Sequence, residues 1–144
     1  MKIKTFLICW VVSFIVVFGL NGIFHGMLAS SFFDNNLSQF TPVIKKMSDT
    51  NPVWVGLLDL VLTFGMTCFI TFRQQGKISL PQAAFFGGLI NLISSGAWNF
   101  ANAAMFLNWS ISLTLVDLCW HIMLGVLGGL IIGTLHNKFE SKTI

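Results

Sequence analysis

The chain has 144 residues, of which 55% are hydrophobic and only 9% are charged, with eight Lys and Arg against five Asp and Glu. Soluble domains carry about 25% charged residues, so this composition excludes a soluble globular protein and a disordered chain. The net charge of +3 is too small to favour a nucleic-acid partner. The composition therefore indicates an all-α integral membrane protein whose main partner is the lipid bilayer.

Four long segments with few or no charged residues follow one another along the chain. A bilayer core about 30 Å thick needs roughly 20 apolar residues per helix. The segments predict four transmembrane helices, at about residues 5–29, 52–72, 80–106 and 110–135. Asn51 and Pro52 favour the start of the second helix, as an N-cap followed by proline at the first helical position. We expect residues 1–144 to form a single four-helix transmembrane domain.

The Lys and Arg residues outside these segments predict the orientation. Only Lys45 and Lys46 lie on one side of the membrane, whereas the other side carries Lys2, Lys4, Arg73, Lys77, Lys138 and Lys142. Because cytoplasmic loops carry an excess of Lys and Arg, both termini are predicted to be cytoplasmic, in a bacterial inner membrane. Residues 30–51 then form an outer loop, in which residues 40–47 form either a short interfacial helix or an ordinary loop.

Each predicted helix carries one stripe of polar or small residues, at the four-residue spacing that places side chains on one helix face. The stripes are Ser13, Val17, Asn21 and His25; Asp59, Thr63, Thr67 and Thr71; Gly88, Asn91, Ser95, Asn99 and Asn102; and Asp117, His121, Gly125, Gly129 and Gly133. An Asp at mid-helix costs about 2.5–3.5 kcal/mol on insertion scales, so Asp59 and Asp117 are expected to face the bundle interior or water.

The polar ends of these stripes lie at similar depths, which predicts a pocket open to the outer side and sealed on the cytoplasmic side. Its predicted lining is Asn21, His25, Asp59, Asn91, Asn99, Asn102, Asp117, Trp120 and His121. For the Asn and Thr residues, the alternative is a structural role as hydrogen-bonding contacts between helices. His25 is expected to be a solvated residue near the interface.

Three glycines in the last helix repeat at the small-xxx-small spacing of closely packed membrane helices. Gly125, Gly129 and Gly133 serve either packing within the chain or a homodimer face. The three cysteines are isolated and lack the paired thiols of a thiol oxidoreductase. No cofactor is predicted.

Three motifs resemble those of small four-span bacterial proteins known only as predicted membrane proteins of unknown function. Residues 20–26 (LNGIFHG) resemble the family's Leu-Asp-x-x-Trp-x-Gly run, residues 98–102 (WNFAN) its Tyr-Asp-x-x-Asn run, and residues 114–120 (TLVDLCW) its Thr-Leu-Val-Asp-x-x-Trp run. The resemblance implies the fold and the pocket but no activity. Asn21 and Asn99 are amides where the family pattern has Asp, and His121 follows the tryptophan.

The function that we favour is non-enzymatic: the pocket binds, and helps to translocate, a small molecule, ion or lipid. One alternative is an intramembrane enzyme that uses Asp59, Asp117 and His121 as a carboxylate pair or an acid–base dyad. A second is a metal site made by His25, His121, Asp59 and Asp117. A third is an assembly subunit whose stripes pack against a partner protein.

Overall fold

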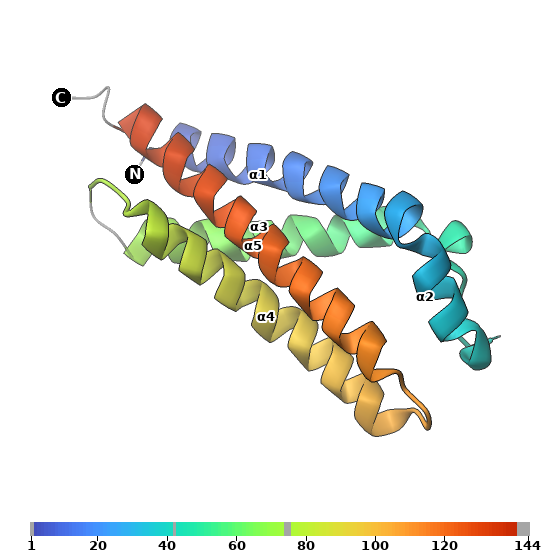
Figure 1. Cartoon of the computed structure of the whole chain (residues 1–144). Helices are drawn as coiled ribbons and strands as arrows, with labels where there is room; N and C mark the ends of the chain where they lie inside the picture. The colour runs from blue at the N-terminus through green and yellow to red at the C-terminus, as the bar shows by residue number, and fades with distance from the viewer. Residues whose placement is uncertain (1, 42, 74–75, 141–144) are drawn as a thin grey trace.

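The computed structural model describes residues 2–41, 43–73 and 76–140, and every regular element in these ranges is helical (Figure 1). The long helices are α1 (Ile3–Ile23), α3 (Pro52–Arg73), α4 (Leu80–Met105) and α5 (Ile111–Glu140). A π-helical turn, η1 (Phe24–Leu28), extends α1 and leads into the short helix α2 (Ser30–Leu37). Two 3₁₀ turns complete the elements, η2 (Ser38–Phe40) and η3 (Met47–Asp49).

The connection between the first two long helices differs from the prediction. Its helix is α2, at residues 30–37, and not the interfacial helix considered for residues 40–47. The side chain of Asp34 on α2 accepts a hydrogen bond from the backbone N–H of Met47 at 2.7 Å, which folds the later part of the segment back onto α2.

Three helical runs in the described residues are long and apolar enough to cross a membrane: Ile3–Leu28, Pro52–Phe72 and Ile111–Glu140. The fourth long helix, α4, has 26 residues but is not among these runs. Its Ser94, Ser95, Asn91, Asn99 and Asn102 lower its mean hydropathy. The protein is therefore an all-helical membrane protein with three candidate spans. The fourth predicted span, which corresponds to α4, is not one of them.

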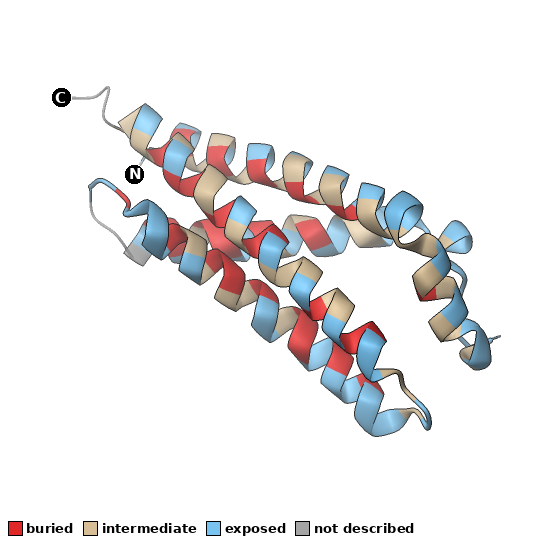
Figure 2. Cartoon of the chain, viewed as in Figure 1, coloured by how far each residue is buried: buried red, intermediate tan, exposed pale blue. Residues whose placement is uncertain are grey.

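Many large apolar side chains are exposed, and many polar side chains are buried beside the apolar core; Figure 2 shows that the buried positions lie on the helix faces turned toward neighbouring helices. Leu58 and Trp98 are 56% and 65% exposed, whereas Ser13, Thr63 and Thr67 are fully buried. The threonines of the α3 stripe donate to backbone carbonyls one turn earlier in their own helix, as Thr67 does to Thr63 O at 2.8 Å. Their hydroxyls are thus satisfied locally and do not join helices. An apolar exterior around buried and mostly hydrogen-bonded polar groups suits a lipid solvent.

The closest helix packing joins α4 to α5, and it resolves the role of the glycine repeat. A Cβ atom on Gly125 would collide with the backbone oxygen of Gly87, and one on Gly129 with that of Ala83. Gly133 is buried as well, and a Cβ atom there would make tight contacts with the side chains of Ala83 and Leu80. These three glycines therefore pack against α4 of the same chain, the first of the two roles considered for the repeat, and the homodimer face through Gly125, Gly129 and Gly133 has no support.

Hydrogen bonds at the two ends of the bundle show how its helices run. At one end the backbone N–H of Lys2 donates to Glu140 Oε1 at 3.0 Å, and Asn137 pairs with both backbone groups of Ile78 at 2.7 and 2.8 Å. At the other end Gln39 donates to the backbone oxygen of Asn108 at 3.0 Å. The α4–α5 turn therefore lies at the same end as α2, and α4 traverses the length of the bundle (Figure 1).

Candidate functional site

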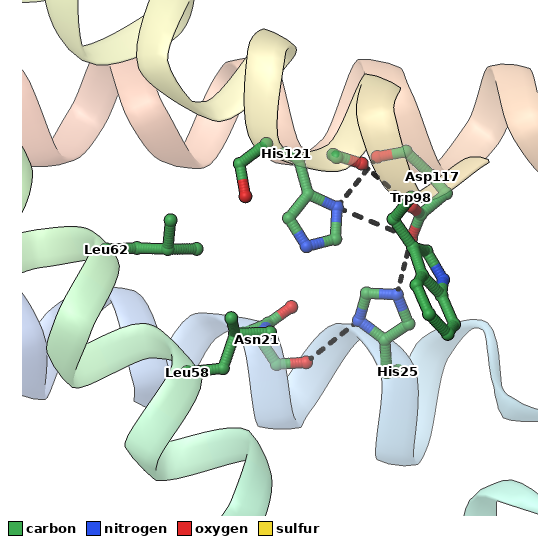
Figure 3. Close-up of a pocket in the computed structure, with 9 residues that line it drawn as sticks. Asn21, His25, Leu58, Leu62, Trp98, Asp117 and His121 are labelled. Carbon is green, nitrogen blue, oxygen red and sulfur yellow. Dashed lines mark hydrogen bonds and ion pairs between the residues drawn. The ribbon is translucent and has the colours of Figure 1, made fainter. Parts of the chain in front are cut away.

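A cavity of about 530 Å³ lies in the half of the bundle nearer to α2, where all four long helices contribute to its wall. We refer to it as the chamber. Figure 3 shows its lining, which consists of Asn21, His25, Leu58, Leu62, Ser94, Ser95, Trp98, Asp117 and His121. Most of the surface area of the wall is apolar. The polar groups converge on one side of it, where η1, α4 and α5 meet.

The π-helical turn positions one of these polar groups. In η1 the backbone N–H of Ala29 bonds to the carbonyl of Phe24, five residues earlier, at 2.8 Å. π-Helical turns are rare in proteins, and those that occur are often located at functional sites. His25 lies in this turn, and its ring contacts Phe33 of α2 with 4.6 Å between the ring centroids. The side chain of His25 is only 21% exposed and bonds to Asp117, so the expectation of a solvated histidine is wrong.

The carboxylate of Asp117 is the centre of the polar side of the chamber. Its Oδ2 accepts from Asn99 Nδ2 at 2.6 Å and from Ser95 Oγ at 2.9 Å, both on α4. Its Oδ1 lies 3.2 Å from His25 Nε2 and 3.4 Å from His121 Nδ1. A carboxylate offers about four lone-pair sites, and polar groups of this chain lie against both oxygens of Asp117.

Asp59 belongs to a second set of contacts behind the chamber wall. It is 3% exposed, and its Oδ2 accepts from Asn21 Nδ2 at 3.2 Å. The amide oxygen of Asn21 in turn accepts from Trp120 Nε1 at 3.2 Å. Trp120 stacks on Phe24 with ring centroids 3.9 Å apart, which fixes the indole against η1. Asn21 therefore links α3 to α5 through α1.

One ring nitrogen of His121 remains available. Its Nδ1 lies 2.9 Å from the backbone carbonyl oxygen of Asp117, which can only accept, so Nδ1 carries the hydrogen. In the neutral imidazole, Nε2 then has a free lone pair. Figure 3 shows this nitrogen on the side of the ring away from Asp117, directed into the chamber. Among the described residues, none donates a hydrogen bond to His121 Nε2.

The structure divides the predicted pocket residues into three groups. Asn21, His25, Asp117 and His121 line the chamber, and Asp59, Asn99 and Trp120 lie behind its wall and bond to lining residues. The remaining two lie elsewhere. Asn91 contacts Met66 Sδ at 3.0 Å deeper in the bundle, and Asn102 is buried near the end of α4.

Several lining residues were not predicted as site residues. Ser95 was on the α4 stripe but was not among the predicted site residues. Ser94 and Trp98 are four residues apart on the neighbouring face of α4, and this spacing was an available signal. Leu58 and Leu62 gave none, because leucine is the ordinary composition of a membrane helix. Their role depends on how far α3 lies from α4.

Two of the alternative chemistries can be compared with this geometry. Asp59 and Asp117 bond to different partners, and no hydrogen bond joins the two carboxylates in the part of the chain that the structure describes. Within the same residues, no three His, Cys, Asp or Glu side chains are grouped so that they could hold a metal ion. Neither a carboxylate dyad nor a metal centre is supported by this arrangement.

Two smaller cavities border the chamber on the α2 side. One, of about 200 Å³, shares Asn21 and His25 with it, and the other, of about 190 Å³, shares Trp98 and Asp117. Met47 lines both of the smaller cavities. The segment after α2 thus lies between the chamber and the end of the bundle.

One comparison with known proteins found a match. A family model described as "Predicted membrane protein (DUF2177)" matches residues 6–134, which include every residue that lines the chamber. No curated protein and no solved structure matches the chain.

Proposed function

The chain belongs to the DUF2177 family of predicted membrane proteins, and on this premise we propose that it binds a small molecule, ion or lipid in the chamber, within the membrane. The observation that carries the proposal is the chamber itself. Ligand pockets typically have volumes of about 300–1,000 Å³ and mostly apolar walls with a few placed polar groups. The chamber, of about 530 Å³ with its polar groups gathered around Asp117, has this composition.

The proposal includes a fourth span formed by α4. This helix has no charged residue, and its 26 residues extend about 39 Å, which is enough to cross a bilayer. It runs beside α5, a candidate span, from one end of the bundle to the other. Its polar residues face α5 and the chamber, whereas Phe85, Ile93 and Phe100 are exposed, as lipid-facing residues are.

We further propose that the end with the chain termini is cytoplasmic. Lys2, Lys77 and Lys138 are located at this end, and Lys45 and Lys46 at the other. The excess of positive charge favours the first end as the inner one. The chamber then lies in the outer half of the membrane, and the tightly packed glycines of α4 and α5 lie below it.

Native mass spectrometry of the protein purified from its membrane tests the proposal. We expect an adduct of defined mass on the wild type. Ser94→Trp places an indole in the chamber and should lower the bound fraction at least about tenfold, equivalent to a loss of about 1.4 kcal/mol of binding free energy. Ile93→Trp is the matched control, because Ile93 is the neighbouring residue on α4 and is 63% exposed. Equal adducts on all three proteins, or no adduct on any of them, would contradict a binding function.

A further inference from the structure

The chamber opens between two helices, toward the lipid. Leu58 of α3 and Trp98 of α4 line it, yet more than half of each side chain is exposed. Nearer the chain termini the same two helices are in contact, with 5.2 Å between the ring centroids of Phe69 and Phe86. The two helices are therefore in contact nearer the termini, whereas at the level of the chamber exposed side chains of both helices border its opening. In a bilayer, this gap leads from the chamber into the hydrocarbon region.

The polar wall of the chamber favours a ligand with one kind of polar group. Asp117 Oδ2 accepts from Asn99 and Ser95, and Oδ1 lies 3.2 Å from His25 Nε2, so both oxygens of the carboxylate already have polar partners on this chain. The amide of Asn21 is likewise bonded on both sides, to Asp59 and Trp120. In the neutral imidazole, His121 Nε2 faces the chamber with its lone pair free. It requires a hydrogen-bond donor, and a neutral one suffices.

From the position of the gap and the free acceptor together, we infer that the ligand is a neutral amphiphile with a hydroxyl head group. The hydroxyl donates to His121 Nε2, and the alkyl chain passes between Leu58 and Trp98 into the bilayer. This inference rests on the proposed function and specifies its ligand class and its route of entry. Burial of the alkyl chain against leucine and tryptophan provides little specificity, so the hydroxyl contact determines which lipids bind.

Photolabelling in reconstituted phosphatidylcholine vesicles tests the inference. The probe is hexadecanol with a mid-chain diazirine, and its methyl ether, which lacks the donor, is the comparison. We expect the alcohol to label Leu58, Leu62 and Trp98, relative to lipid-facing Ile93, about tenfold more than the ether does, the ratio that a hydrogen bond of about 1.4 kcal/mol gives. His121→Phe should reduce labelling by the alcohol to the level of the ether, whereas His121→Gln, which keeps an acceptor, should retain most of it.

Met123→Phe is the matched control for the aromatic substitution, since Met123 lies on the same helix and is 45% exposed. Equal labelling by alcohol and ether would overturn the inference, as would stronger labelling by the corresponding hexadecylamine than by the alcohol. A diazirine-bearing butanol that labels the chamber while hexadecanol does not would also overturn it, because the ligand would then be water-soluble. In each of these cases the adduct lost in Ser94→Trp would still support the proposed function, so the two failures are distinguishable.

Discussion

At the scale of single residues, each carboxylate within the bundle is paired with an amide. Asn21 donates to Asp59, and Asn99 donates to Asp117. These two amides occupy the positions at which the sequence departs from the Asp residues of the motifs that it resembles. An amide always has N–H donors, whereas an Asp side chain donates only when it is protonated. Asn at positions 21 and 99 is therefore chemically consistent with the carboxylates that remain at Asp59 and Asp117.

Asn21→Leu tests the importance of this pairing. The substitution leaves the buried Asp59 without its side-chain donor from α1, and a buried polar group without a partner costs about 1–3 kcal/mol. We expect the free energy of unfolding in mixed micelles to fall by this amount. The double variant Asn21→Leu/Asp59→Leu should lose less than the sum of the two single variants, because the second change removes the unsatisfied carboxylate. Strict additivity would show that the two side chains do not interact.

At the scale of elements, the contact between α4 and α5 depends on the absence of side chains. Gly129→Ala forces a methyl group against the backbone of Ala83, which can relieve the overlap only if the helices move apart. Overpacking of this kind typically costs about 1–3 kcal/mol, and we expect a corresponding loss in the free energy of unfolding.

The matched control is Gly65→Ala in α3, where an added Cβ meets no atom within 4 Å. Alanine has the higher helix propensity, so this variant should be neutral or slightly stabilising. A Gly129→Ala protein as stable as Gly65→Ala would mean that α4 and α5 are not packed as the structure shows.

At the scale of the whole molecule, the number of spans determines on which side of the membrane each turn lies. With the proposed cytoplasmic N-terminus and four spans, the α4–α5 turn is outside and Lys138 is inside. With three spans, in which α4 does not cross, both positions change sides.

Leu107→Cys and Lys138→Cys, each in a chain whose Cys9, Cys68 and Cys119 are replaced by serine, distinguish the two topologies. Leu107 is in the α4–α5 turn and is 89% exposed. We expect an impermeant maleimide to label Leu107→Cys in intact cells, and Lys138→Cys only after permeabilisation. The reverse result would contradict the proposed topology of four spans with cytoplasmic termini.

Much of the fold follows from the sequence because the solvent imposes it. Long uncharged segments can bury their backbone polar groups in lipid only as helices, which fixes the number and approximate bounds of the long elements. The four-residue spacing of Ser13, Asn21, Asp59 and Thr63 was sufficient to identify the buried faces, since a polar residue in a membrane helix avoids the lipid. The two acidic residues of the bundle were recognised for the same reason.

The tertiary structure decided what those buried faces do. Spacing alone did not distinguish the deep Asn91, which packs beside Met66, from Asn99, which holds Asp117. It also did not predict the π-helical turn that carries His25, or the assignment of the glycine repeat to α4 instead of a second chain. The physical reason is that periodicity specifies which direction a side chain faces within its own helix. The distances and crossing angles between helices arise from packing across the whole bundle, and these determine that the chamber opens between α3 and α4.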